Sequence, residues 1–340
     1  MMKILTCPSP GCWEYKEAAM PVAQAGEAII KIKRIGVCGT DLHAFNGTQP
    51  YFEYPRTLGH ELSGELLKTD GVTSLQPGDT VTVIPYFHCG HCLACRSGKP
   101  NCCVTVKVLG VHIDGGMQEY IKVPASALVQ GQGLHVDELA LVEPLAIGLH
   151  GIRRAAIQRG EYVLVMGAGP IGLAAITFAQ IAGARVIAMD IHPQRLHFCQ
   201  QRLNVSHVLN TATDDVTAQL QEITGGDMAA VVIDATGHLA AINKGLYYLG
   251  HGGRYVLIGL QKEALVFSHP EFHKRETTLM SSRNATRTDF EQVIDYISNG
   301  IIDPLAYVTH YAAFDDVPSL FDTLTTPGSS AIKGLVRISD

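Results

Sequence analysis

A glycine-rich turn constrains the fold of this 340-residue chain more than any other feature. Before the turn, residues 162–166 form a continuous apolar run that predicts a buried strand. After it, residues 172–182 are small and apolar and predict a helix. Strand-like and helix-like segments then alternate at 185–190, 193–203, 229–234 and 254–259. This alternation predicts an α/β fold with a doubly wound parallel sheet.

The turn reads Gly167-Ala168-Gly169-Pro170-Ile171-Gly172, and its glycines have the spacing that a dinucleotide needs. Gly167 permits the tight turn, Gly169 lets a pyrophosphate approach the backbone, and Gly172 lets helix and strand pack closely. The pyrophosphate would lie at the helix N-terminus, where free N–H groups favour negative charge. Asp190, which ends the next strand, would bind the adenosine ribose and repel a 2′-phosphate, so we expect NAD rather than NADP. The expected cofactor-binding residues are Gly167, Gly169, Pro170, Ile171, Gly172, Asp190 and Arg195, the last either beside the adenine or in solvent.

Length, charge and apolar runs narrow the class of protein. At about 150 residues per domain the chain predicts two domains, and residues 3–142 are β-rich, with short apolar alternations between Gly and Pro turns. The net charge of −6 disfavours a nucleic-acid partner. No apolar run reaches the ~18–20 residues that a membrane span needs, and the first ten residues do not resemble a secretory signal. We therefore expect a soluble, cytoplasmic protein with no nucleic-acid or membrane partner.

Five of the nine cysteines crowd into the segment from Cys89 to Cys103. Cys89, Cys92 and Cys95 form two successive Cys-x-x-Cys steps, and Cys103 follows after seven residues. Four thiolates at this spacing can surround Zn²⁺ tetrahedrally. An odd number of clustered cysteines favours metal-binding thiols over disulfides. We expect a structural zinc site on these four cysteines, with Cys102 as an alternative to Cys103. A zinc-ribbon nucleic-acid module would share these steps, but the acidic net charge argues against it.

A second set of candidate zinc ligands is distributed over three short motifs. A mixed set of Cys, His and Glu that leaves one coordination position open to substrate is typical of catalytic zinc. Each motif is weak alone, and their joint appearance in front of a dinucleotide fold is much stronger. The motifs are Gly36-Val37-Cys38-Gly39-Thr40-Asp41-Leu42-His43, Gly59-His60-Glu61 and Leu141-Val142-Glu143-Pro144.

With these motifs in this order, the chain resembles the zinc-dependent medium-chain alcohol dehydrogenases, in their sorbitol and threonine dehydrogenase branch, over essentially its whole length. The resemblance implies a GroES-like β-rich catalytic domain from residues 1–144 and 284–340, with a zinc lobe at about 86–105. It places a Rossmann NAD-binding domain at 145–283. It further implies two zinc ions and NAD per chain, and a homodimer or homotetramer. A zinc-binding structural or sensor protein would be expected to have lost some of these ligands.

The resemblance also assigns roles near the second zinc. Cys38 and His60 would be ligands, and Asp41 would orient His60. Glu61 would be either a ligand or a carboxylate that displaces bound water. Glu143 stands where classical members have a second cysteine, and whether it binds zinc directly or through water stays open.

Thr40 and His43 match the family's proton relay from the substrate alcohol to solvent. More narrowly, segments 270–276 and 282–286 are similar to bacterial sugar-acid dehydrogenases of the L-galactonate 5-dehydrogenase type. In the second segment, Arg283 could form a two-pronged hydrogen bond with a substrate carboxylate, or could instead contact the cofactor. We therefore expect oxidation of a secondary alcohol on a sugar acid, with a polyol or L-threonine as the alternative substrate.

Overall fold

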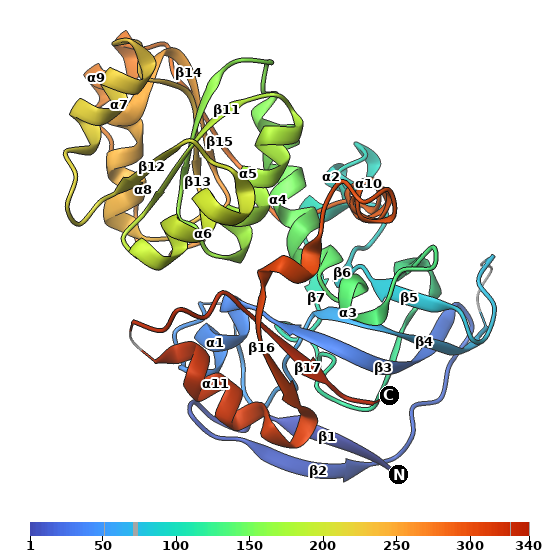
Figure 1. Ribbon diagram of the computed structural model, residues 1–340. Coiled ribbons are helices and arrows are strands. Elements are labelled where there is room, and N and C mark those ends of the chain that lie inside the picture. Colours follow the sequence, from blue (N-terminus) through green and yellow to red (C-terminus); the bar gives the residue numbers. More distant parts are fainter. Residues whose placement is uncertain (51, 71–73, 327, 340) are drawn as a thin grey trace. The chain divides into compact units, whose positions relative to one another are not determined.

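The computed structural model describes residues 1–50, 52–70, 74–326 and 328–339 (Figure 1). The chain divides into two compact units, one made of Met1–Ala146 with Asn284–Asp340 and the other of Ile147–Arg283. Helix α4 (Val142–Ala155) begins in the first unit and ends in the second. Among the described helices, none is both long enough and apolar enough to cross a membrane.

The second unit is built on a six-stranded parallel sheet with the order β12-β11-β10-β13-β14-β15. Val163 to Met166 of its central strand are completely buried, which explains their unbroken apolar run. The expected doubly wound parallel sheet is confirmed, with helices on both faces. Its strands are β10 (Tyr162–Met166), β11 (Arg185–Asp190), β12 (His207–Asn210), β13 (Ala229–Asp234), β14 (Leu249–Leu257) and β15 (Thr278–Ser281). Its helices are α5 (Pro170–Ile181), α6 (Pro193–Leu203), α7 (Val216–Thr224), α8 (Leu239–Gly245) and α9 (His269–Lys274).

The strand order reverses at β10, which lies between β11 and β13. In open parallel sheets, ligands bind at the carboxyl ends of the strands beside such a reversal. The glycine-rich turn begins at that end of β10, and Asp190 ends the neighbouring β11. The topology therefore places the expected cofactor residues at one edge of the sheet.

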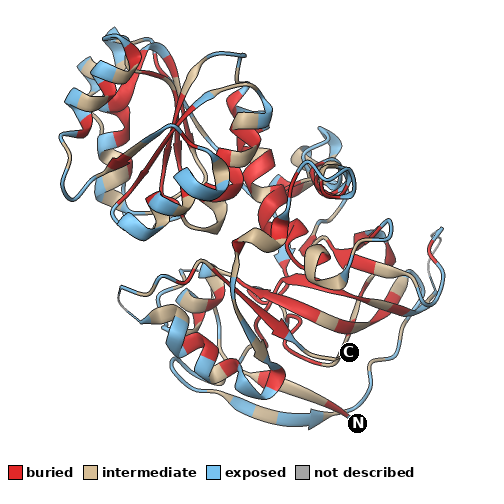
Figure 2. Cartoon of the chain, viewed as in Figure 1, coloured by how far each residue is buried: buried red, intermediate tan, exposed pale blue. Residues whose placement is uncertain are grey.

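The first unit contains a mixed sheet with the order β16-β17-β3-β4-β5-β9, in which β8 also pairs with β3. Figure 2 shows buried residues concentrated on the central strands of this sheet. Its strands are β3 (Glu27–Val37), β4 (Glu61–Thr69), β5 (Thr80–Val83), β8 (Tyr120–Pro124), β9 (Leu128–Gln130), β16 (Val308–Ala313) and β17 (Lys333–Arg337). Two smaller pairs are β1 (Met2–Thr6) with β2 (Glu14–Ala18), and β6 (Tyr86–Phe87) with β7 (Lys107–Val108). The helices are α1 (Gly39–Phe45), α2 (Leu93–Arg96), α3 (Val136–Leu139), α10 (Arg287–Ser298) and α11 (Val317–Thr325).

The register of three adjacent strands positions the centre of this unit. Strand β3 pairs antiparallel with β4 on one side, where Gly36 lies opposite Glu61. It pairs antiparallel with β17 on the other side, where Val37 lies opposite Gly334. The end of β3, the start of β4 and the start of β17 therefore meet, although β17 is far from the other two in sequence.

Candidate metal centres and cofactor site

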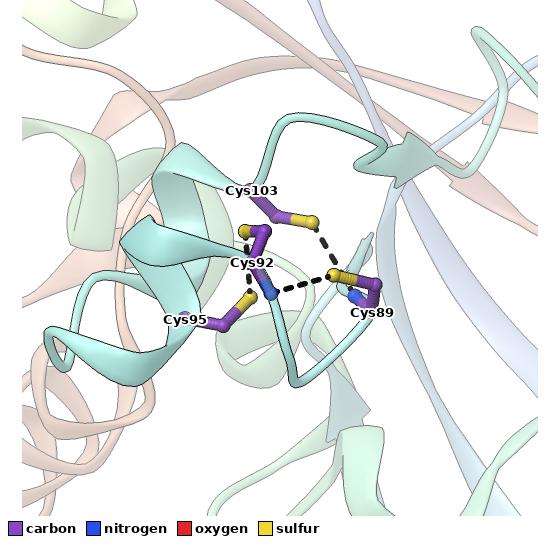
Figure 3. Close-up of side chains that lie close together, drawn as sticks. All are labelled: Cys89, Cys92, Cys95 and Cys103. Carbon is purple, nitrogen blue, oxygen red and sulfur yellow. Dashed lines mark hydrogen bonds between the residues drawn. The ribbon is translucent and has the colours of Figure 1, made fainter.

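The four cysteines of the predicted structural site converge, and Figure 3 shows their side chains pointing toward one another. Their sulfur atoms all lie within 4.8 Å of one another. The Cys89 N–H donates to Cys103 Sγ at 3.3 Å, and the Cys92 N–H donates to Cys89 Sγ at 3.4 Å. Cys102 is exposed and lies outside this group. The geometry therefore supports the register that uses Cys103.

The chemistry of these sulfurs fits a soft divalent cation. The N–H groups of His91 and Cys92 lower the pKa of Cys89 to about 6, which favours its thiolate at neutral pH. Desolvation raises the pKa of Cys95 to about 12, so this thiol keeps its proton at neutral pH until a cation beside the sulfurs favours the thiolate. A tetrahedral set of four thiolates is the donor set that structural zinc takes.

A second group of possible ligands forms where β3 ends and β4 begins. The donor atoms of Cys38, His60 and Glu61 lie within 4.8 Å of one another. Asp41 links the two segments: its Oδ2 accepts the Cys38 N–H at 2.9 Å, and its Oδ1 accepts the Gly59 N–H at 3.1 Å. This buried carboxylate fixes the backbone on both sides of the group. We call Cys38, His60 and Glu61 the mixed centre.

The electrostatic field at the mixed centre favours positive charge. Burial alone would lower the pKa of His60, but the charges of Asp41, Cys38 and Glu143 raise that pKa well above its ordinary value. His60 Nδ1 is 3.6 Å from Asp41 Oδ1, too far for a hydrogen bond, and this buried nitrogen bonds no other described residue. His60 and Glu61 are buried and Cys38 is half-buried, and this set of S, N and O donors in a negative field fits a zinc ion. That Asp41 orients His60 stays a prediction.

Glu61 has a counter-charge that the sequence analysis missed. Lys333 Nζ donates to the Glu61 carboxylate and to the Val37 carbonyl, and both charged side chains are buried. Burial alone would lower the pKa of Lys333, but the charges of Glu61, Cys38 and Glu143 together raise that pKa above its ordinary value. A Cβ on Gly36 would lie 1.9 Å from Glu61 Oε2, so only glycine fits there. The available signal was a lysine directly before the uncharged residues Gly334, Leu335 and Val336 of a strand.

Glu143 has a different partner and is not part of the 4.8 Å group. It lies in the first turn of α4, and its Oε1 accepts a hydrogen bond from the Tyr86 hydroxyl. Burial raises the pKa of Glu143 to about 7, although the nearby His60 charge opposes this shift. Burial and the Glu143 charge raise the pKa of Tyr86 well above its ordinary value, so Tyr86 remains a donor. The sequence analysis also missed Tyr86, which stands three residues before Cys89.

The expected relay residues lie on α1, beside Cys38. Thr40 and His43 are three residues apart and so lie on one face of the helix. Thr40 is half-buried and His43 is exposed. His43 Nδ1 is 2.9 Å from Thr48 Oγ1, and the Thr48 hydroxyl donates to the His43 carbonyl at 3.3 Å. The Thr48 hydroxyl has then used its one proton, so it accepts a hydrogen bond from His43 Nδ1. The other ring nitrogen, Nε2, carries no proton and can act as an acceptor.

The glycine turn of the second unit fits a pyrophosphate. Gly167 has φ +93°, which favours glycine, and a Cβ on Gly172 would lie 1.7 Å from the Gly167 carbonyl oxygen. Gly169 begins α5 as its N-cap, and a Cβ there would meet only Arg195 Nη1, at 3.8 Å. The space in front of this helix N-terminus is therefore open to a ligand. Pro170 and Ile171, the other expected turn residues, form the first turn of α5.

Asp190 lies beside this turn. Its Oδ2 accepts the Ala168 N–H at 2.6 Å and its Oδ1 accepts the His192 N–H at 2.8 Å. Arg195 Nη1 is 4.0 Å from Asp190 Oδ2. The backbone thus holds the carboxylate beside the glycine turn, and its contact with the ribose stays a prediction.

Two segments, 270–276 and 282–286, carry the resemblance to sugar-acid dehydrogenases, and they have different surroundings in the structure. Most of segment 270–276 belongs to α9 and its C-terminal turn, where Arg275 Nη1 donates to the Leu249 carbonyl at 2.6 Å and Arg275 pairs with Glu271. These contacts fix α9 against the sheet of its own unit. Arg283 is exposed and is the last residue of the second unit.

Comparisons with known proteins agree with this geometry. Residues 24–133 match the alcohol dehydrogenase GroES-like domain, and residues 170–299 match the zinc-binding dehydrogenase family. The chain is 43% identical to L-galactonate-5-dehydrogenase of Escherichia coli K12, over 98% of both chains.

Two solved structures cover nearly the whole chain. One is an E. coli oxidoreductase of unknown specificity, ECK1772, at 28% identity and a TM-score of 0.94, covering 100% of both chains. The other is the NADH complex of the alcohol dehydrogenase RspB from E. coli CFT073, at 30% identity and a TM-score of 0.93, covering 99% of both chains. With sequence identity over almost its full length and matches in both units, the chain belongs to the zinc-type alcohol dehydrogenase family and is a dehydrogenase.

Proposed function

We propose that this dehydrogenase oxidises a secondary alcohol of a sugar acid to a keto acid, with NAD⁺ as the hydride acceptor. The 43% identity to an L-galactonate-5-dehydrogenase over 98% of both chains is the observation that supports a sugar acid as the substrate. The mixed centre supports the reaction type, because it brings sulfur, nitrogen and oxygen donors within 4.8 Å of one another. The alternative substrates are L-threonine and a polyol such as sorbitol, which the resemblance to the sorbitol and threonine dehydrogenase branch supports.

Two zinc ions per chain are part of this proposal. Cys89, Cys92, Cys95 and Cys103 would hold one for stability. Cys38 and His60 would hold the other, together with Glu61 or Glu143. Zinc bound there supplies Lewis-acid stabilisation of negative charge on the substrate oxygen, while NAD⁺ accepts the hydride.

The chain's own residues would remove the alcohol proton. The Thr40 hydroxyl accepts the proton from the substrate and passes its own proton toward His43. His43 Nε2 can accept it, because Thr48 holds the opposite ring nitrogen as an N–H donor. His43 is exposed, so the proton can leave from it to solvent.

NAD is proposed over NADP because of Asp190. The carboxylate is fixed by the backbone N–H groups of Ala168 and His192 and carries a negative charge beside the cofactor turn. Ribose hydroxyls can donate to such a group, whereas a 2′-phosphate would be repelled by it.

We also propose a homodimer or homotetramer working in the cytoplasm. β15 is an edge strand whose Leu279 is exposed, and within the described residues it pairs only with β14. An exposed edge of this kind can pair with a second copy. All nine cysteines are free thiols, which suits a reducing compartment. Light scattering of the purified protein would measure the oligomeric state.

The substrate is tested by initial-rate assays with NAD⁺ on L-galactonate, other aldonates, sorbitol and L-threonine. We expect the highest kcat/KM on an aldonate. Arg283→Ala should raise KM for that aldonate about tenfold, or ~1.4 kcal/mol, and leave the matching neutral polyol unchanged. Efficient turnover of sorbitol or L-threonine with none of an aldonate would disprove the proposed substrate. An equal loss on both substrates would place Arg283 at the cofactor instead.

A further inference from the structure

We propose that Tyr86 is a positioning residue that couples the four-cysteine site to the mixed centre, by holding Glu143 in place as a further metal ligand. This inference rests on the proposed two-zinc function. Tyr86 is buried, and its hydroxyl donates directly to Glu143 Oε1. A carboxylate held in this way through Oε1 still offers Oε2 to a cation.

The surroundings of Tyr86 fix the direction of its hydroxyl. Its ring packs edge-on against Phe290 of α10, with ring centroids 6.5 Å apart and an interplanar angle of 77°. A glutamate side chain has several rotatable bonds, and a fixed hydrogen bond to one oxygen removes much of that freedom. Groups that orient metal ligands commonly change metal affinity by about 10–100-fold when they are removed.

The proposed function makes Glu143 one of the two carboxylates that would complete the metal site at Cys38 and His60. Glu61, the other carboxylate, already has the Lys333 ammonium as its counter-charge. Glu143 has a neutral phenol as its partner instead, so it keeps its full charge for a cation when ionised.

Tyr86 is also attached to the four-cysteine segment. It lies in β6, which pairs with β7 through Tyr86 opposite Val108 and Phe87 opposite Lys107. All four cysteines lie between these two strands in sequence. The short β6-β7 pair therefore closes the base of the segment that the first metal would organise.

Residues 88–100 of that segment carry three of the four cysteines and include no buried residue. Helix α2 lies within this part, and its Leu93 is 72% exposed. Without a cation, this part of the segment lacks both the metal–sulfur bonds and an apolar core. We infer that losing this cation loosens the β6-β7 pair, and that Tyr86 then no longer holds Glu143. Metal at the four cysteines should thus strengthen metal binding at the mixed centre.

The test measures metal affinity, not turnover. Co²⁺ bound by four thiolates and Co²⁺ bound by mixed donors differ in visible spectrum, so the two centres can be followed separately in chelator competition. Tyr86→Phe removes only the hydroxyl and retains the ring that packs on Phe290. We expect it to weaken the mixed centre about 10–100-fold and leave the four-cysteine centre unchanged.

A matched control is Tyr15→Phe. The Tyr15 ring also packs edge-on against a phenylalanine, Phe314, and its hydroxyl donates to the Phe314 carbonyl at 2.6 Å. It lies at neither centre, so we expect both affinities to be unchanged. Mixed-centre affinity in Tyr86→Phe equal to that of the wild type would overturn the inference.

A double-mutant cycle tests the coupling itself. Cys92→Ser should weaken the mixed centre in the wild-type background but have little further effect in the Tyr86→Phe background. Equal weakening in both backgrounds would show that the coupling does not pass through Tyr86. If Cys92→Ser fails to fold, Cys92→His, which keeps a metal-ligating nitrogen at this position, replaces it. Wild-type protein that binds fewer than two metal ions would refute the proposed function itself, whereas the Tyr86→Phe comparison bears on the coupling alone.

Discussion

At the scale of single residues, the buried pair of Lys333 and Glu61 has the largest predicted effect on stability. In the metal-free protein, Lys333→Met would leave the Glu61 charge buried without a counter-charge, which costs about 3–5 kcal/mol. Urea denaturation should show this loss in the free energy of unfolding. The double variant Lys333→Met with Glu61→Gln should recover much of it, because no unpaired charge remains. A single variant as stable as the wild type would mean that water reaches the carboxylate.

A second residue-scale prediction concerns Asp190. Asp190→Ala removes the charge that should repel a 2′-phosphate, so the ratio of kcat/KM for NAD⁺ to that for NADP⁺ should fall. Asp190→Asn is the matched control for geometry, because an amide oxygen can still accept the Ala168 N–H. It should lose selectivity but keep more of the thermal stability. An unchanged ratio in both variants would assign the selectivity to other residues.

The sequence predicted residues whose roles depend on local motifs. Gly167, Gly169 and Gly172 follow from spacing along a short segment, and the four-cysteine group follows from its steps. Lys333 and Tyr86 could not be found this way, because their partners are distant in sequence. Lys333 and Glu61 are 272 residues apart, and Tyr86 and Glu143 are 57 apart. Only strand register and helix packing bring such pairs together.

At the scale of elements, two glycines at the start of α5 differ in role: Gly172 is needed for packing and Gly169 for binding the cofactor. Gly172→Ala would place a Cβ 1.7 Å from the Gly167 carbonyl oxygen, so helix and strand must separate and the melting temperature should fall. A Cβ at Gly169 meets only Arg195 Nη1, at 3.8 Å, and φ there is −76°. Gly169→Ala should therefore melt like the wild type but bind NADH more weakly, as fluorescence titration would show. Loss of stability in Gly169→Ala would contradict this assignment.

The same scale shows where element boundaries could be predicted. The apolar runs of β10, β11 and β13 gave those strands their observed bounds, and α6 also begins and ends where expected. α10 begins at Arg287, because Thr286 is its N-cap and donates its N–H and its hydroxyl to Asp289 Oδ2. β14 begins at Leu249 and not at 254 because pairing with β13 extends it through a glycine-rich stretch that reads as a turn.

At the scale of the whole molecule, two metal centres with different donors should respond differently to chelation. We expect two zinc equivalents per chain by metal analysis. A chelator should abolish activity once it has removed the first zinc equivalent, because the mixed centre has fewer sulfur donors than the four-cysteine centre. Cys89→Ser should retain less zinc and lower the melting temperature, whereas Cys102→Ser, outside the group, should change neither. Full activity with one equivalent would refute two zinc ions with separate roles.

The strand that carries Lys333 also has a consequence for synthesis. Ribosomes add roughly 5–20 residues per second, so the 272 residues between Glu61 and Lys333 take roughly 14–54 s to appear. During that interval the nascent chain has made Cys38, His60 and Glu61, and β3 has no β17 beside it. The second unit, Ile147–Arg283, is complete before β17 emerges and is free to fold first. The mixed centre is thus among the last parts of the molecule to mature, and a premature stop before residue 333 would leave a complete second unit beside an unfinished first one.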